Sequence, residues 1–188
     1  MRFNVLFVVI VFGVFHSHNY LYAYFYNIGS LCGQASLITY ILTLLPGIGE
    51  RLGLRNKILA ILRIYRRYLG ILMYFFAFAH ISFVKIFFLD SLQGALPQGT
   101  SETMGAIAFM ILLLLFLTSN NLSLSGLRIW WYRIQRFTYL VMFFVFLHVA
   151  FFRLNFLSAL MGLVVVLEMA SFVVIIRKTG SLTGGKPS

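Results

Sequence analysis

The chain has 188 residues, of which 61% are hydrophobic and only 10% are charged, and its formal net charge is +11. A soluble domain must cover its surface with far more polar side chains than this, so the composition excludes a soluble globular protein. The apolar runs are long and continuous, which favours transmembrane helices over the alternating strands of an outer-membrane barrel. Cys32 is the single cysteine, so no intramolecular disulfide is expected.

Six apolar segments follow one another along the chain, at residues 3–22, 28–46, 67–89, 103–119, 133–152 and 155–176. They predict an all-α integral membrane protein, a six-transmembrane helix bundle with both termini in the cytoplasm. Residues 1–176 are expected to form one domain with its core at 28–176, and residues 177–188 a short cytoplasmic tail. No internal repeat is recognised.

Three of the predicted boundaries have local signals. The first segment also fits a secretory signal peptide, because Met1-Arg2 precedes an apolar core, but no small-x-small cleavage site follows and a retained helix is expected. The second segment is expected to stop at Pro46-Gly47, where a helix loses a hydrogen-bond donor. The fifth and sixth segments meet at Arg153-Leu154-Asn155, a connection short enough to make them antiparallel neighbours.

Lysine and arginine orient the predicted bundle. Lys85 and Arg153 fall on one side of it, and the remaining thirteen fall on the other: Arg2, Arg51, Arg55, Lys57, Arg63, Arg66, Arg67, Arg128, Arg133, Arg136, Arg177, Lys178 and Lys186. The positive-inside rule places these thirteen in the cytoplasm. The net charge then reflects topology and contact with anionic membrane lipid, and no nucleic acid is expected as a partner. Residues 48–66 mix apolar and basic residues at helical spacing and predict an interfacial helix on the cytoplasmic leaflet.

Two histidines stand alone in apolar, aromatic runs, AFAHISF and VFLHVAF. His80 lies 13 residues beyond Arg67 and His148 lies 12 beyond Arg136, which is about 20 and about 18 Å of helix. Both histidines are therefore expected in the outer half of the membrane, at nearly one depth on separate helices. Two neutral imidazoles at one level can bind haem iron from both faces, whereas a single intramembrane histidine often only hydrogen-bonds a neighbouring helix. The neighbours expected to leave room for a ring and to pack on it are Ala77, Ala79, Ala150, Phe76, Phe78, Phe83, Phe146 and Phe151.

Four motifs carry a family resemblance: GQASLITYILTLLP, RRYLGILMYFFAFAH, GAIAFMILLLLFLTSNN and WWYRIQRFTYLVMFFVFLH. In them the chain resembles the ferric-reductase-like transmembrane domain family, and within it the haem-binding membrane subunit of the bacterial periplasmic methionine-sulfoxide reductase system. The resemblance covers most of residues 28–176. It implies b-type haem held between the third and fifth helices, with His80 and His148 as axial ligands of the iron, electron transfer across the membrane, and location in a bacterial inner (plasma) membrane.

The chain departs from this family at the positions of a second haem nearer the cytoplasm. Many members have histidines there, but this chain has Arg66 or Arg67 in the third segment and Gln135 in the fifth. One haem is therefore expected, and the second remains open. A gap of about 20 Å then separates the inner face from the haem. A flavin or quinone ring among Trp130, Trp131, Tyr132 and Tyr139, or an unorthodox second haem with Gln135 near it, is expected to fill this gap.

Other polar residues have positions that suggest roles. Lys85 and Arg153 each follow a histidine by five residues, about 7–8 Å of helix, and are expected to meet haem propionates or to snorkel at the membrane boundary. Glu168 is an intramembrane carboxylate and is interpreted either as a protonated hydrogen-bonding group or as a proton relay. His16 and His18 are interpreted as part of a wet loop. Asn120 and Asn121 are interpreted as caps of the fourth helix.

These observations lead to a hypothesis of function: a b-type haem membrane subunit that carries electrons from a cytoplasmic flavin or quinone donor to an acceptor on the periplasmic side. No G-x-G-x-x-G motif is found, so a cytoplasmic flavin reductase is expected as a separate partner. A periplasmic reductase or a metal ion is the expected acceptor. Two alternatives stay open: a haem-free membrane scaffold or assembly subunit, and a small proton-coupled transporter that uses Glu168 and the histidines.

Overall fold

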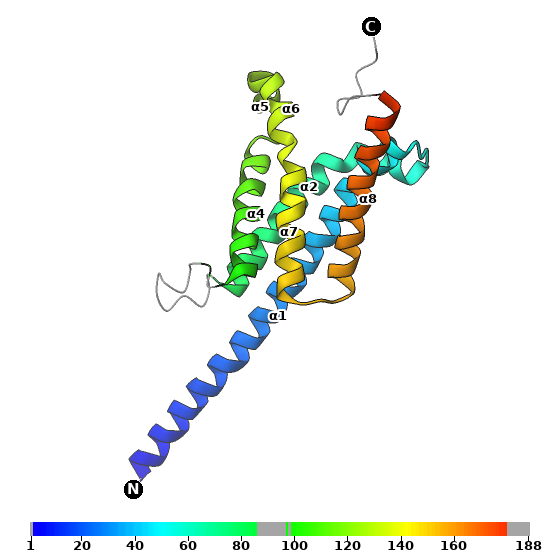
Figure 1. The fold of residues 1–188 in the computed structure, drawn as a ribbon. Helices are drawn as coiled ribbons and strands as arrows, with labels where there is room; N and C mark the ends of the chain where they lie inside the picture. Colours follow the sequence, from blue (N-terminus) through cyan, green and yellow to red (C-terminus); the bar gives the residue numbers. More distant parts are fainter. Residues whose placement is uncertain (1, 86–96, 98, 180–188) are drawn as a thin grey trace.

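The computed structural model describes residues 2–85, 97 and 99–179, and within these the side chains from Ala23 to Arg177. The described chain is helical, with its helices arranged as an elongated bundle (Figure 1). The helices are α1 (Arg2–Leu52), α2 (Lys57–Val84), α4 (Thr100–Leu117), α5 (Asn121–Leu127), α6 (Ile129–Gln135), α7 (Phe137–Phe152) and α8 (Phe156–Thr179).

Five helical stretches among the described residues are long and apolar enough to cross a membrane: Ala23–Leu52, Lys57–Val84, Thr100–Leu117, Ile129–Phe152 and Phe156–Arg177. The chain is therefore an all-helical, multi-pass membrane protein. These stretches correspond to the second to sixth predicted segments. The first predicted segment, 3–22, is not a separate helix, because α1 runs without a break from Arg2 to Leu52, and His16 and His18 lie within this helix and not in a loop. The side chains of residues 1–22 lie outside the described residues.

The predicted ends of the second segment are wrong, because α1 is one continuous helix from Arg2 to Leu52 and Pro46 lies inside it. The hydroxyl groups of Thr39 and Thr43 donate to backbone carbonyls of the turns before Pro46, the kind of bond that accompanies proline inside transmembrane helices. The helix ends instead at Gly53, which has a φ of 78°. The Gly53 amide donates to Glu50 and the Leu54 amide to Gly49, so the last carbonyls are satisfied by a glycine C-cap.

The predicted interfacial helix over residues 48–66 is also wrong as a separate element. Its first residues complete α1, and residues from Lys57 onward begin α2 without a further break. Asn56 starts α2, since its side chain accepts a hydrogen bond from the amide of Ile58. Apolar side chains on this first part of α2, such as Ile58 and Ile64, are exposed. The amphipathic pattern therefore belongs to the end of a transmembrane helix.

The bundle consists of two helix pairs and α8. The main contacts join α1 to α2 and α4 to α7, and α8 packs against α1. The buried core includes Tyr40, Leu44, Val141, Met142 and Met161, which come from α1, α7 and α8. The α7–α8 connection at residues 153–155 is as short as predicted. α2 packs mainly on α1, and α7 packs mainly on α4.

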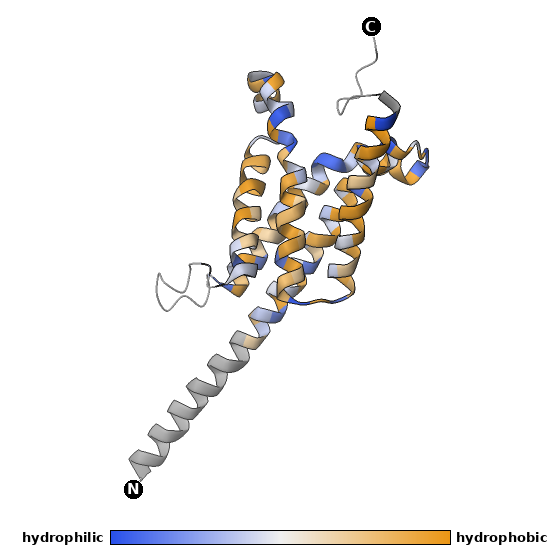
Figure 2. Cartoon of the chain, in the orientation of Figure 1, coloured by the Kyte–Doolittle hydropathy of each residue, from blue (hydrophilic) through white to orange (hydrophobic). Residues whose placement is uncertain are grey.

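Hydrophilic residues gather towards the ends of the bundle, and the helices between them are mostly hydrophobic (Figure 2). Arg51 closes α1, Lys57 opens α2 and Arg177 lies in the last turns of α8, so these three helix ends form one basic end. Lys85 and Arg153 cap the opposite ends of α2 and α7. The assignment of the basic end to the cytoplasm stays a prediction. Arg2, Lys178 and Lys186 lie outside the described side chains.

Candidate functional site

The two predicted ligand histidines face one another across the bundle. His80 lies near the end of α2 and His148 near the end of α7, and both are half-buried. Their ring centroids are 6.4 Å apart, with the ring planes inclined by 67°. The structure therefore brings together, at one depth, two residues that are 68 positions apart in the sequence.

His80 is held by α1. Its Nδ1 lies 2.8 Å from the carbonyl oxygen of Gly29. The same ring packs on Gly33, one helical turn further along α1, where a Cβ atom would lie only 2.8 Å from Nδ1. A contact this short is not tolerated between real atoms, so the position of the ring requires glycine at residue 33.

His148 is held in the same way by α4. Its Nδ1 lies 2.8 Å from the carbonyl oxygen of Ser101, and a Cβ atom at Gly105 would come within 2.7 Å of it. The hydroxyl of Ser101 adds a contact that His80 does not have among the described residues: it donates to the backbone carbonyl of His148 at 2.8 Å and lies 3.3 Å from Nδ1. Each imidazole therefore packs against a glycine, and its Nδ1 is bonded to the carbonyl of the residue four positions before that glycine.

These contacts determine which ring nitrogen can bind a metal. A carbonyl oxygen only accepts hydrogen bonds, so Nδ1 of each ring carries the proton and Nε2 keeps a free lone pair. This is the arrangement in which proteins present histidine to a metal ion. Two metal–nitrogen bonds of about 2 Å, with about 1 Å from each nitrogen to its own ring centre, add up to about 6 Å. The observed 6.4 Å between ring centroids is close to this sum, and it is also the separation of an ordinary edge-to-face ring contact.

The two histidines have no further metal-ligating side chain grouped with them among the described residues. Within the described part of the chain, no group of three or more His, Cys, Asp or Glu side chains gathers in a ligating arrangement. Two neutral imidazoles are the axial ligands that haem takes in many electron-transfer proteins. Binding of a haem between these two histidines stays a prediction.

The two outer cations have different surroundings. Lys85 forms an ion pair of 2.7 Å with Glu102 at the start of α4, which the sequence analysis did not predict. This pair joins the end of α2 to the helix that holds His148. Arg153 caps α7 with extended backbone and is exposed. Contact of either residue with haem propionates stays a prediction.

The residues predicted around an inner carrier divide between two places. Gln135 uses its amide to donate to the hydroxyl of Thr118 at 3.1 Å, and Trp131 donates to the carbonyl of Thr118 at 2.8 Å. Both therefore tie α6 to the end of α4. Trp130 and Tyr132 are mostly exposed. Tyr139 instead packs against Phe172 of α8.

The aromatic neighbours of the histidines also divide into groups. Phe78 stacks on Tyr74, which in turn stacks closely on Phe116 of α4, with ring centroids 4.3 Å apart. Phe83 stacks on Phe25 of α1. Phe146 and Ala150 instead line an open groove of about 490 Å³ between α7 and α8. The prediction that these last two residues pack around the ligand ring is wrong, because they lie on the side of α7 that faces α8.

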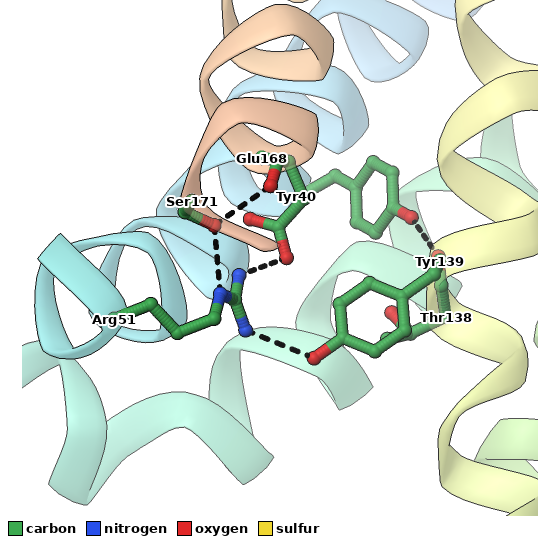
Figure 3. Close-up of polar contacts among 6 residues, drawn as sticks. All are labelled: Tyr40, Arg51, Thr138, Tyr139, Glu168 and Ser171. Carbon is green, nitrogen blue, oxygen red and sulfur yellow. Dashed lines mark hydrogen bonds and ion pairs between the residues drawn. The ribbon is translucent and has the colours of Figure 1, made fainter. Parts of the chain in front are cut away.

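Glu168 does not stand alone in the membrane. Arg51, on the last turn of α1, forms an ion pair with Glu168 and donates to the hydroxyl of Ser171 at 2.7 Å (Figure 3). It also donates to the hydroxyl of Tyr139 at 3.3 Å, and its guanidinium group lies over the ring of Phe172. Arg51, one of the thirteen cations predicted on the cytoplasmic side, is therefore mostly buried, with 11% of its side chain exposed. The second carboxylate oxygen of Glu168 has no protein partner among the described residues.

The residues that the sequence analysis missed are the four that hold the histidines. Gly29 and Gly33 form a G-x-x-x-G motif, the spacing that lets transmembrane helices approach closely, and Ser101 and Gly105 repeat it with a small residue first. Asn120, which was expected to cap α4, does so by donating to the carbonyl of Leu117, and it also caps the start of α5.

No protein-family model, curated protein or solved structure matches this chain. The resemblance to the ferric-reductase-like transmembrane domain family stays a prediction.

Proposed function

We propose that this protein is a membrane electron-transfer subunit of the ferric-reductase-like type, with one b-type haem held between His80 and His148. The observation that carries the proposal is the matched geometry of the two imidazoles. Their centroids are 6.4 Å apart, and each Nδ1 is bonded to a backbone carbonyl. Simple packing of two unrelated histidines does not require the same tautomer, the same glycine contact and a separation that suits one metal ion.

Two axial imidazoles favour electron transfer over substrate chemistry. When bound, the haem supplies a one-electron couple, and with both axial positions filled by protein no open position remains for a substrate. The residues of the chain fix the two ligands from opposite helix pairs. The surroundings of the two histidines are apolar and aromatic. They keep water away from the site and limit structural rearrangement around the haem when its oxidation state changes.

The direction of transfer follows from the charges. The basic end of the bundle suits a cytoplasmic donor, such as a separate flavin reductase or a reduced quinone, and His80 and His148 lie nearer the opposite end. A periplasmic reductase or a metal ion is the proposed acceptor there. The bacterial inner membrane is the proposed location. Because the amide of Gln135 is already bonded to Thr118, we propose that Gln135 is not a ligand of a second haem.

A haem-free scaffold is the second candidate, and one observation favours it. The Nδ1 bonds already join α2 to α1 and α7 to α4, so each histidine has a structural role without any ligand. The two candidates differ in a simple property: the scaffold is colourless and takes up no haem.

The deciding experiment is the visible spectrum of the purified protein, repeated on single-histidine variants. We expect sharp reduced b-type bands in the wild-type protein. His80→Ala and His148→Ala each remove one axial bond and should abolish or strongly change these bands, whereas His16→Ala and His18→Ala should leave them unchanged. A colourless wild-type protein, or wild-type bands in both His80→Ala and His148→Ala, contradicts the proposal.

A further inference from the structure

The haem site proposed above is assembled from two copies of one local arrangement. In the first, α1 provides the Gly29 carbonyl and Gly33 to His80 of α2. In the second, α4 provides the Ser101 carbonyl and Gly105 to His148 of α7. The two Nδ1–oxygen distances are both 2.8 Å, and a Cβ at either glycine would lie within 2.8 Å of the ring nitrogen. The sequence analysis recognised no repeat, because the two stretches share only this spacing.

Helix geometry explains why a glycine must accompany the carbonyl. In an α-helix the carbonyl of residue i points at the amide of residue i+4, so the side chain of residue i+4 stands next to that carbonyl. Any side chain there blocks the approach of a flat ring from the side. Glycine at residue i+4 leaves the carbonyl accessible to a second donor, and the imidazole takes that place in both halves of the site.

We propose that Gly33 and Gly105, together with the carbonyls of Gly29 and Ser101, are the positioning residues of the metal site: they fix each imidazole with its proton on Nδ1 and its Nε2 towards the metal. This inference rests on the proposed haem function. It adds that ligand orientation is set from α1 and α4, helices that carry no ligand themselves. The two axial ligands are then held by the same kinds of contact, except that the Ser101 hydroxyl adds one on the His148 side.

The test compares three Gly→Ala variants of the full-length haem protein. Gly33→Ala and Gly105→Ala each introduce a methyl group within 2.8 Å of Nδ1, so the ring must move and its bond to the carbonyl must lengthen. Loss of such an outer contact lowers metal affinity by about 10- to 100-fold, and we expect a loss of this size in haem affinity together with shifted electron paramagnetic resonance g-values of the oxidised form. Gly70→Ala is the matched control, because a Cβ at Gly70 of α2 meets no atom within 4 Å.

A measurement on the wild-type protein covers the case in which a variant does not fold. Nuclear magnetic resonance of the oxidised protein detects hyperfine-shifted ring N–H protons of both ligands. Protons donated to buried carbonyls exchange slowly with deuterium oxide, so two slowly exchanging ring N–H signals are expected. Ser101→Ala keeps the carbonyl and should keep both signals.

The outcomes separate the two proposals. A wild-type protein without haem overturns the proposed function and the positioning role with it. If the wild-type protein binds haem but Gly33→Ala and Gly105→Ala match Gly70→Ala in affinity and g-values, the positioning role alone is overturned. Rapid exchange of both ring N–H protons in the wild-type protein has the same consequence.

Discussion

Arg51 and Glu168 form an ion pair that joins the last turn of α1 to the middle of α8, with only 1% of the Glu168 side chain exposed. The guanidinium group is held in addition by Ser171, Tyr139 and the ring of Phe172. This arrangement favours a structural role for Glu168 over a free proton relay, because its charge is balanced by a cation fixed on three other sides. The continuation of α1 past Pro46 brings Arg51 to this position.

The first prediction concerns removal of the carboxylate. Glu168→Ala leaves Arg51 buried without its partner, and breaking one side of a buried pair costs about 3–5 kcal/mol. We expect the thermal unfolding midpoint in detergent to fall sharply. Glu50→Ala is the control, because the Glu50–Arg63 pair is more than half exposed on both sides and such pairs contribute about 0–1 kcal/mol. Equal midpoints for the two variants contradict a buried ion pair.

The second prediction concerns stoichiometry. The inner ligand positions hold Arg66, Arg67 and Gln135, and two of these are already bonded: Arg67 donates to Ser119 and Asn121, and Gln135 to Thr118. We expect one haem per chain in a pyridine-haemochrome assay, and Gln135→Ala should leave this value unchanged. A value near two per chain, falling towards one in Gln135→Ala, would show that Gln135 is an iron ligand.

The third prediction concerns the direction of electron transfer. A donor that docks on the basic end should be repelled by charge reversal there, so Arg66→Glu should slow haem reduction from that side. Raising the salt concentration should slow wild-type reduction too, because exposed charges are screened beyond about 10 Å at 0.1 M. Reduction kinetics in oriented vesicles, with donor on one side only, measure both effects. Arg153→Glu, at the opposite end, is the control, and faster reduction from the Arg153 side reverses the assignment.

The fourth prediction concerns Arg128, which connects α5 to α6. Its φ of 47° and ψ of −112° belong to a region that residues with a side chain rarely adopt. Such a conformation costs about 1–3 kcal/mol, and glycine adopts it without this cost. Arg128→Gly should therefore raise the thermal unfolding midpoint, while Arg128→Ala, which loses the same charge, should not. A midpoint for the glycine variant at or below that of the alanine variant refutes strain at this position.

Hydrophobic segments predicted the helices well because a membrane imposes a length and an apolar surface that any sequence must show. Boundaries set by packing were less predictable. Pro46 suggested a stop, but the helix runs through it, and the proline is fully buried. The true end at Gly53 depends on a positive φ, and a nearby glycine, Gly47, offered an equally good local signal.

The histidine pair could be predicted because the depth of a residue in the membrane follows from counting residues along a spanning helix. What holds the histidines could not, because a backbone carbonyl carries no sequence signal and a glycine has many possible roles. The spacing of Gly29 and Gly33 was the available signal, and it gains meaning only when His80 is known to lie beside it. The partner of Glu168 was hidden for a related reason: Arg51 lies at the end of a helix, where most arginines point outwards.

The pairing of α1 with α2 and of α4 with α7 has a consequence for biogenesis. Each histidine and the carbonyl and glycine that orient it lie within one helical hairpin, so each hairpin can insert from the translocon as a finished unit with its own imidazole already in place. The hairpin of α1 and α2 leaves the ribosome first and is in the membrane before the α4–α7 hairpin has been synthesised. We expect cofactor loading to coincide with the lateral docking of these two units in the bilayer, since only their union presents both ligands at once.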